Sequence, residues 1–196
     1  MTDSDEQFDL DIRRTVLLGK YMQHWGMPRE RLRFHRGSDV VEVYLFPANE
    51  KVPIARVASV GASAFVRPGV WRCEFVLVLP PDMGGASFRS VASFVMDFVL
   101  YARQPEVNLR SGCTAPESKL LPAEWPTRAA MVTEPLGEPE ELETLHVGTQ
   151  HVNLWWLVPI HGAEYNLIQQ QGIEAFHALE EASEWSLADV RRPPLV

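Results

Sequence analysis

Residues 150–182 read QHVNLWWLVPIHGAEYNLIQQQGIEAFHALEEA, an apolar run followed by a helical pattern around which the rest of the chain is organised. It opens with a nearly unbroken apolar run from Val152 to Ile160, interrupted by Asn153 and stopped at Pro159. A short run that is rich in β-branched and aromatic residues is typical of a strand buried on both faces. The sequence therefore predicts a central buried strand over residues 152–160.

A helix is predicted directly after this strand. His161 or Gly162 can end the strand, and Glu164 then falls in the first turn of the helix, where a carboxylate suits the exposed N–H groups and the dipole. Gly172 interrupts the helical pattern, either as a kink in one helix or as a break between two shorter ones. The apolar positions at helical spacing are Leu167, Ile168, Ile173, Phe176 and Leu179.

The adjacent pair Trp155 and Trp156 bears on the layering of the fold. Neighbouring strand residues face opposite sides of a sheet, so both rings are buried only where each face is covered. We favour burial of both over the alternative, in which one of them is an exposed binding hot spot.

Upstream of residue 150, apolar patterning predicts two helices and five strands. Residues 106–127 show little periodicity, and we interpret them as a long excursion with a short strand at 107–109; such segments are often functional. The predicted helices span 9–25 and 87–101, and the predicted strands span 40–46, 52–60, 71–79, 129–133 and 142–147.

Together these elements predict a single α+β domain over residues 8–196. Its sheet is expected to be mixed and mainly antiparallel, with three main helices packed around it as an α/β sandwich. Residues 1–7 are expected to be disordered, and the tail RRPPLV is expected to lie on the surface.

Composition favours a cytoplasmic protein. The N-terminus MTDSDEQFDLD is acidic and carries no signal-like apolar segment, and no run reaches the roughly 18 apolar residues that a membrane span needs. The two cysteines, Cys73 and Cys113, form no Cys-x-x-Cys motif, which suits a reducing compartment.

The charge is divided unevenly along the chain. Residues 1–116 carry 14 Lys and Arg against 13 Asp and Glu, a net charge of +1, whereas residues 117–196 carry 4 against 13, a net charge of −9. The acidic half argues against nucleic acid as a partner, because binding has to overcome repulsion by the phosphates. It is compatible with a basic protein partner, which such a charge would steer, but we favour the simpler interpretation of a solvated, solubilising surface.

A local basic cluster precedes the first predicted strand and comprises Arg29, Arg31, Arg33, His35 and Arg36. It can bind an anion or an acidic peptide. We favour the alternative interpretation, a solvated strand edge whose arginines pair with nearby acids.

Residues 150–182 resemble the C-terminal signature of the Suppressor-of-fused family. In that signature a buried strand ends in a Leu-Val-Pro-like motif, and a Glu shortly after it opens a helix that holds a Gly; the matching positions are Leu157, Val158, Pro159, Glu164 and Gly172. The family's Asp-x-x-Arg-Pro ending is matched by Asp189, Arg192 and Pro193. A family strand with a Glu before an apolar run that ends in Leu-Pro is matched by Glu74, Leu79 and Pro80.

This resemblance covers residues 10–196 and implies a binding and regulatory module rather than an enzyme. Bacterial proteins of this kind are commonly viewed as immunity proteins that neutralise partner toxins. We therefore expect a protein partner, such as a basic toxin domain, with no nucleic acid, membrane, metal or cofactor involved. The resemblance supplies no contact residues. Charge and loop character favour the acidic turn Glu138, Glu140, Glu141 and Glu143, together with the 106–127 excursion.

The rival hypotheses are a hydrolase-type enzyme that uses the 106–127 loop with Cys113 or His161, and a scaffold with a partner that is not a toxin. No nucleophile-elbow, Walker or dinucleotide-binding glycine pattern occurs. His161, Glu164 and His177 come nearest to a metal cluster, but the two histidines lie about four helical turns apart. We therefore interpret Glu164 as a helix cap, and whether Cys113 is reactive stays open.

Overall fold

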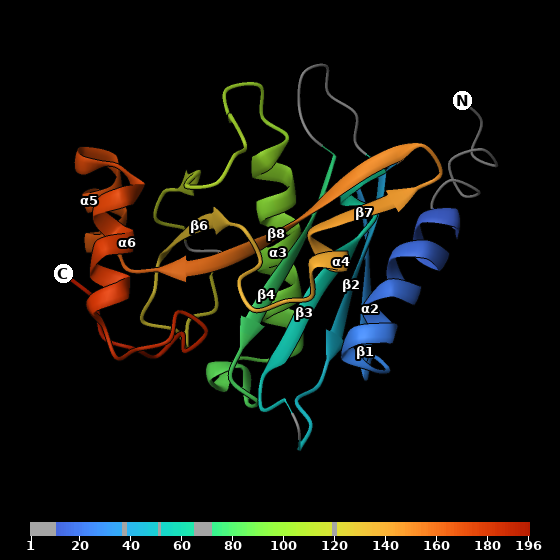
Figure 1. Ribbon diagram of the computed structural model, residues 1–196, viewed down its shortest axis with the longest axis horizontal. Helices are drawn as coiled ribbons and strands as arrows, with labels where there is room; N and C mark the ends of the chain where they lie inside the picture. The colour runs from blue at the N-terminus through green and yellow to red at the C-terminus, as the bar shows by residue number, and fades with distance from the viewer. Residues whose placement is uncertain (1–10, 37–38, 51, 65–71, 119–120) are drawn as a thin grey trace.

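The computed structural model of the protein describes residues 11–36, 39–50, 52–64, 72–118 and 121–196 (Figure 1). The segment 1–7 lies outside these residues. In chain order the elements are the π-helical turn η1 (Arg14–Leu18), α2 (Gly19–Trp25), β1 (Glu30–Arg36), β2 (Asp39–Phe46), β3 (Ala55–Val60), η2 (Ala62–Ala64), β4 (Cys73–Leu79), η3 (Met83–Gly85), α3 (Phe88–Ala102), β5 (Thr114–Ala115), β6 (Ala129–Thr133), α4 (Glu140–Glu143), β7 (Thr144–Val147), β8 (Gln150–Ile160), α5 (Gly162–Gln171) and α6 (Ile173–Ala182).

The described strands form one sheet in the order β1-β2-β3-β4-β8-β6-β5, with β7 also paired to β8. The β4–β8 pair is parallel, and the other described pairs are antiparallel. Asn153 pairs with Cys73 of β4 on one edge of β8 and with Thr144 of β7 on the other. On this second edge, β7 pairs with the first part of β8 and β6 pairs with the last part. This arrangement confirms the predicted fold class, a mixed and mainly antiparallel sheet flanked by helices.

Strand β8 is the central element of the sheet, as predicted, and it runs from the β7 hairpin near α2 to the start of α5 (Figure 1). It begins at Gln150, two residues before the expected start. Pro159 lies within it and opposite Ala130, so the proline does not stop the strand as expected. Because β4 pairs only with residues 153–156, Pro159 occupies a position that tolerates a residue without an N–H.

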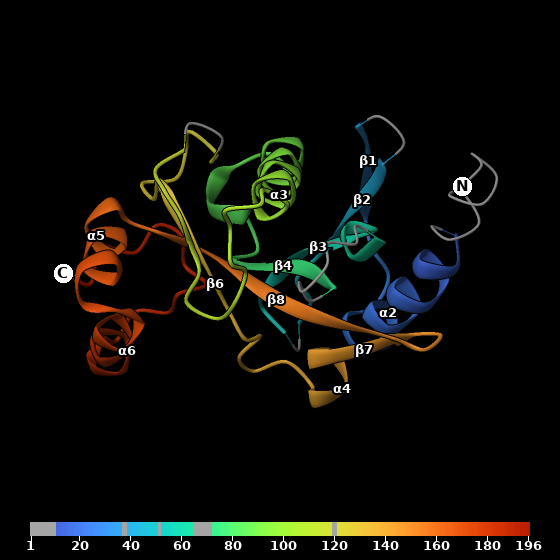
Figure 2. The same ribbon diagram turned by 90° about the horizontal axis from the view of Figure 1, so that it is seen from above.

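Helices cover both faces of the sheet, and α5 and α6 lie at the end of β8 (Figure 2). Helix α3 packs on one face, whereas η1 and α2 pack on the other. Trp156 belongs to the second core and is 7% exposed, while Trp155 is half-buried against the first. The two indoles therefore lie on opposite faces as predicted, with Trp155 less completely buried than Trp156.

Several expected boundaries differ from those in the structure. Residues 107–109 form no strand; Val107 and Leu109 are instead buried anchors of an irregular segment, and the short strand is β5. The expected strand 142–147 begins at Thr144, because residues 140–143 form the helical turn α4 around the buried Leu142. Gly172, with φ +87°, separates α5 from α6, so this region forms two shorter helices rather than one kinked helix.

The N-terminal helical segment ends at Trp25, as predicted, with Gly26 at φ +86° as its C-cap. Within the described part of the chain, no helix combines the length and apolar character needed to cross a membrane.

Candidate functional site

Glu74 lies in β4, is fully buried, and organises the chain where β3 ends. Its carboxylate accepts hydrogen bonds from three consecutive backbone N–H groups, those of Gly61 at 2.9 Å, Ala62 at 3.2 Å and Ser63 at 3.0 Å. The hydroxyl groups of Ser59 and Ser63 also donate to it, at 2.6 and 2.7 Å. A buried carboxylate requires such donors in place of water, so this predicted motif residue has a structural role.

Arg13 joins the same network from the N-terminal helical segment and is 2% exposed. Its guanidinium donates to Ser63 Oγ at 3.3 Å and to Gln150 Oε1 at 2.6 Å. The Tyr21 hydroxyl donates to the Ser59 carbonyl at 3.4 Å. Burial, together with the nearby charge of Glu74, raises the pKa of Tyr21, so that its hydroxyl stays a donor. The network thus connects the first helical segment with β3, β4 and the start of β8.

Glu164 is the third residue of α5 and is fully buried. It accepts the His161 N–H at 2.8 Å, which confirms its predicted capping role. The sequence did not reveal its other partners: Arg192 donates through both Nη atoms at 2.5 and 2.9 Å, and the Leu195 N–H donates at 2.9 Å. Burial alone favours the neutral acid, but Arg192 outweighs it and lowers the pKa of Glu164.

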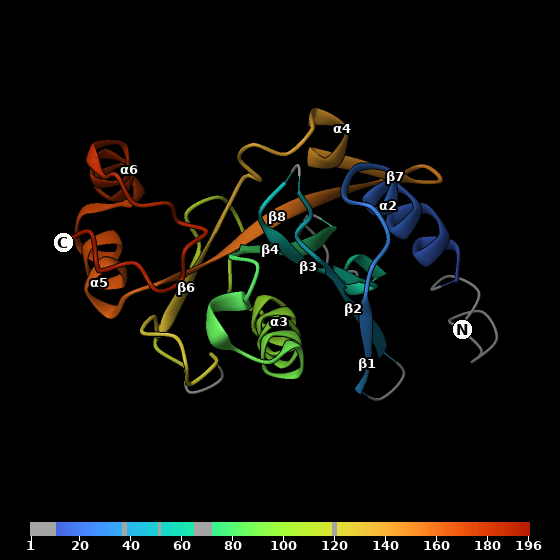
Figure 3. The same ribbon diagram turned by 90° about the horizontal axis from the view of Figure 1, so that it is seen from below.

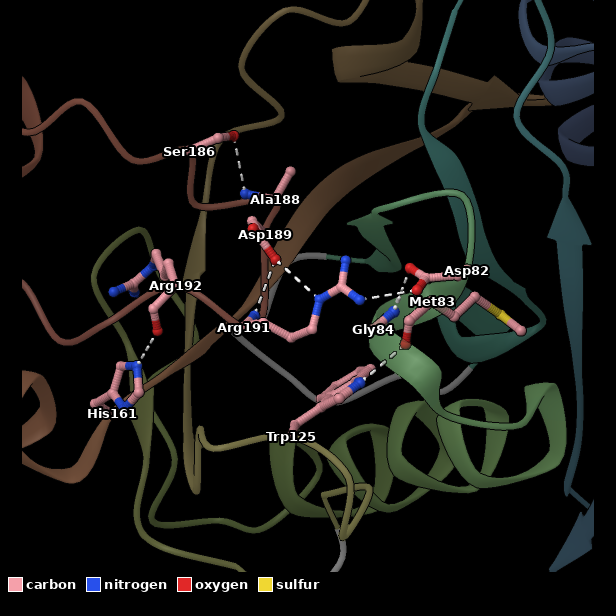
Figure 4. A network of polar contacts seen from close by, with 10 residues as sticks. All are labelled: Asp82, Met83, Gly84, Trp125, His161, Ser186, Ala188, Asp189, Arg191 and Arg192. Atoms are coloured by element: carbon pink, nitrogen blue, oxygen red, sulfur yellow. Dashed lines mark hydrogen bonds and ion pairs between the residues drawn. The ribbon is translucent and has the colours of Figure 1, made fainter.

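The tail that follows α6 is also held by the loop after β4 (Figure 4). Arg191 donates to Asp82 Oδ2 at 2.8 Å, and its backbone N–H donates to Asp189 Oδ1 at 3.0 Å. His161 Nε2 lies 2.9 Å from the carbonyl oxygen of Arg192. The expectation that the tail RRPPLV lies on the surface is therefore wrong for Arg192, which is 1% exposed because its charge is paired inside the protein.

The same loop packs closely against Trp125 and the tail. Trp125 is fully buried, donates from Nε1 to the Met83 carbonyl at 3.0 Å, and contacts Phe94 edge-on. Gly84 has φ +64°, and a Cβ there would lie 2.3 Å from Val190 Cγ2 and 2.9 Å from Trp125 Nε1. The loop, the excursion and the tail thus form one packed unit.

The predicted acidic turn divides into two parts in the structure. The Glu138 side chain is 2% exposed, and its Oε1 accepts from Arg56 Nε at 2.5 Å. Its Oε2 accepts from Trp25 Nε1 at 2.7 Å, and the Arg56 guanidinium also lies over the Trp25 ring. Glu138 is therefore committed to a buried structural contact and is not available to a partner in this state.

The remaining three acids of the turn are exposed on α4. Glu140, Glu141 and Glu143 surround Leu142, which is 0% exposed and fixes the short helix against β8. Beside them lies a hollow of about 180 Å³, whose polar walls include Glu134, Glu143, Thr144 and Asn153. The structure thus brings three of the four predicted contact residues together on one acidic surface.

The 106–127 excursion is anchored by buried residues and borders a groove against α3. The groove has a volume of about 370 Å³. Its described lining includes Phe94, Phe98, Tyr101, Ala115, Pro116 and Leu121. Tyr101 donates to the Thr114 carbonyl at 3.1 Å, which holds β5 against α3.

The groove gives little support to the hydrolase hypothesis, because Cys113 and His161 do not line it. Cys113 is half-buried, and burial raises the pKa of its thiol despite the nearby Arg110, which disfavours the nucleophilic thiolate. Cys73 is buried, and burial followed by the charge of Glu74 raises its pKa as well. Among the described residues, no group of three or more His, Cys, Asp or Glu side chains is arranged to hold a metal ion.

Most of the basic cluster lies in the edge strand β1, and two of its arginines, Arg31 and Arg33, approach the buried Glu42, as does Arg14 from the N-terminal helical segment. Arg14, Arg31 and Arg33 lie 3.8, 3.5 and 3.7 Å from Glu42 Oε1. The Tyr44 hydroxyl donates to Glu42 Oε2 at 2.5 Å. These contacts support the interpretation as a strand edge whose arginines pair with a nearby acid.

Comparison with known families identifies the fold. The family model "Suppressor of fused protein (SUFU)" matches residues 37–193. This match spans most of the chain, so the protein belongs to the SUFU family. A search of curated protein sequences finds no match.

Solved structures share this fold at low sequence identity. A protein described as a SUFU homologue from Neisseria gonorrhoeae superimposes with a TM-score of 0.72 at 16% identity, covering 95% of this chain and 97% of that one. A chain of the Sufu–Fu complex gives 0.63 at 16% identity, covering 91% and 89%. Suppressor of Fused from Drosophila gives 0.64 at 16% identity, covering 91% of this chain and 49% of that protein.

Proposed function

We propose that this protein is a protein-binding regulatory module that acts as a single SUFU-like domain over residues 8–196. Membership of the SUFU family is the observation that carries the proposal. A structural neighbour with the same fold has been solved as the Sufu–Fu complex, and we infer a protein partner for this chain by that analogy.

Its more specific role is that of a cytoplasmic bacterial immunity protein, which neutralises a basic toxin domain by covering the toxin surface. The mechanism is steric and electrostatic, and it needs no cofactor and no chemical step. Support comes from the exposed Glu140, Glu141 and Glu143 in a region of strongly negative charge. Such a surface accelerates the encounter with a cationic partner.

The candidate contact residues are these three acids and the exposed part of the 106–127 excursion. Glu138 is omitted because Arg56 and Trp25 already bind its carboxylate. Trp125, Val107 and Leu109 are omitted as buried anchors of the excursion. These two parts lie on opposite sides of the sheet: α4 packs through Leu142 on one face, and the excursion borders the groove against α3 on the other. The exposed acids of α4 are the part that the charge argument supports.

Affinity capture from a lysate of the protein's own host, at low and at high salt, tests this function. Three baits are compared: the wild type, the variant Glu140→Lys/Glu141→Lys/Glu143→Lys, and a control that reverses three exposed acids of the C-terminal region, Glu174→Lys/Glu181→Lys/Glu184→Lys. A single basic protein, retained near stoichiometrically by the wild type and the control but weakly by the first variant, is the expected result. Equal recovery on all three baits contradicts the surface. No retained partner at either salt concentration contradicts the function.

A further inference from the structure

The β7–β8 hairpin carries two histidines directly opposite each other. His146 of β7 pairs with His151 of β8 in the strand register. Their ring centroids are 4.5 Å apart, with an interplanar angle of 66°. Both side chains are exposed, so solvent reaches the pair. Figure 1 shows the hairpin at the opposite end of β8 from α5 and α6, close to the N-terminal helical segment.

The turn fixes this juxtaposition. Gly148 and Thr149 connect the paired residues Val147 and Gln150, and Gly148 has φ +59°. Glycine with positive φ at the first central position is the requirement of a type II′ turn, a two-residue connection that suits the twist of the strands. The pair that flanks such a turn is hydrogen-bonded, so the next pair is the non-hydrogen-bonded type, with Cα atoms about 4.5 Å apart. The two imidazoles therefore extend side by side.

The opposite face of the hairpin holds the pair in place. Leu145, Val147 and Val152 are buried in the core shared with Leu17 and Tyr21 of the N-terminal helical segment. Because side chains alternate along a strand, burial of this face of the hairpin places both histidines on the opposite face. In the described part of the chain, neither ring takes part in a hydrogen bond or an ion pair, and each ring contacts the other.

We propose that His146 and His151 together bind one divalent late first-row transition-metal ion, of the class Zn²⁺, Ni²⁺ or Cu²⁺. Neutral imidazole is a preferred ligand for these ions, with metal–nitrogen bonds of about 2.0–2.1 Å for zinc. Two adjacent imidazoles on a rigid hairpin reach one ion after small side-chain rotations. The remaining coordination positions stay open for water or for a donor atom from another molecule.

The surroundings favour a cation. The next pair on the same face is Thr144 and Asn153, and these residues border the acidic hollow that also contains Glu134 and Glu143. Carboxylates nearby lower the electrostatic energy of a bound divalent ion without having to coordinate it. The proposed site is independent of the partner-binding function and needs no bound protein.

The site is tested by isothermal titration calorimetry of the full chain with ZnCl₂ and NiCl₂. The protein is purified with a tag that contains no histidine. The wild type is expected to bind one ion. His146→Ala and His151→Ala are each expected to weaken binding about tenfold or more, because the second imidazole no longer binds intramolecularly. His177→Ala, which removes a histidine from α6, is the matched control and is expected to bind as the wild type does. Equal affinity in all four proteins overturns the proposal.

A register-shift variant separates the geometry of the pair from the number of histidines. The double substitution Thr144→His/His146→Thr keeps two histidines on the same face but places them diagonally, about 7–8 Å apart instead of directly opposite each other. It is expected to bind as weakly as the single variants, and wild-type affinity contradicts a site built on the direct pair.

Imidazole NMR of the wild-type protein tests the same site without any substitution. Substoichiometric Ni²⁺ is expected to broaden the resonances of His146 and His151 before those of the other histidines among the six in the chain. Simultaneous broadening of all six, or earlier broadening of another pair, contradicts the proposal.

Discussion

Arg192 donates two hydrogen bonds to the carboxylate of Glu164, at 2.5 and 2.9 Å, and the two side chains are 1% and 0% exposed. The acid comes from the first turn of α5 and the base from the tail beyond α6. Both residues belong to the pattern that resembles the family signature. The pair explains that pattern physically, since it holds the tail at the point where β8 ends and α5 begins.

Breaking this pair should strongly destabilise the protein. Arg192→Met leaves the Glu164 carboxylate buried without its cation, and we expect the free energy of unfolding to fall by about 3–5 kcal/mol. Glu164→Gln should act in the same direction, and the double variant should lose less than the sum of the two. Urea denaturation of the four proteins measures the coupling.

Arg191→Met is the matched control. Its partner Asp82 is 55% exposed, and Arg191 is itself 50% exposed, so the loss should stay below about 1 kcal/mol. If Arg191→Met and Arg192→Met prove equally destabilising, the special role of the buried pair is refuted.

The same pair should make stability depend on acidic pH. The pKa of Glu164 is lower in the folded protein than its ordinary value of about 4.3 in an unfolded chain. Between these two pKa values the unfolded chain binds more protons, so this contribution is complete above the ordinary value and is lost as the pH falls through the folded one. In Glu164→Gln the loss of stability below about pH 4.3 should be shallower. Parallel curves of unfolding free energy against pH for wild type and variant would exclude this contribution.

Substitutions at two neighbouring glycines allow the cost of backbone strain to be measured separately from the cost of a steric overlap. Gly84 and Gly85 both have positive φ, +64° and +84°, so alanine is strained at either position by about 1–2 kcal/mol. A Cβ at Gly84 would overlap Val190 and Trp125, whereas a Cβ at Gly85 meets nothing within 4 Å. We therefore expect Gly84→Ala to lower the free energy of unfolding by about 1–3 kcal/mol more than Gly85→Ala does. Equal losses in thermal unfolding would show that the tail does not pack on this loop.

Glu138 should behave differently from its acidic neighbours. Its ion pair with Arg56 is almost fully buried, at 2% and 11% exposed, so Glu138→Ala should lower the free energy of unfolding by about 3 kcal/mol. Glu140→Ala removes an exposed side chain and should change it by less than about 0.5 kcal/mol. Chemical denaturation of the two variants compares them directly. If Glu138→Ala leaves stability intact, this acid belongs with the partner surface after all.

Local pattern was sufficient to predict the other long strands of the sheet and its main helices, but the edge strand β1 was not among the predicted strands. The apolar run up to Ile160 and the periodic helix from Phe88 to Ala102 can each be recognised within a short stretch of sequence. The strand expected at 107–109 failed because Val107 and Leu109 mimic strand alternation, while both are buried anchors of an irregular segment.

Contacts between segments far apart in the sequence could not be predicted from local patterns. Arg192 meets an acid 28 residues away, and Glu138 meets a base 82 residues away. In sequence, each of them is indistinguishable from a solvated charge. His146 and His151 become neighbours only through the register of a two-residue hairpin, so no spacing along a helix revealed them.

An acidic surface that steers a basic protein partner should be visible in the association rate constant of the captured partner. It should be measured as a function of salt for the wild type, Glu140→Lys/Glu141→Lys/Glu143→Lys and the control Glu174→Lys/Glu181→Lys/Glu184→Lys. We expect the first variant to associate at least tenfold more slowly than the wild type at low salt, and the difference to shrink as salt screens the charges. The control should remain close to the wild type. Identical rate constants and salt dependence for the two triple variants would show that the acids of α4 do not steer the partner.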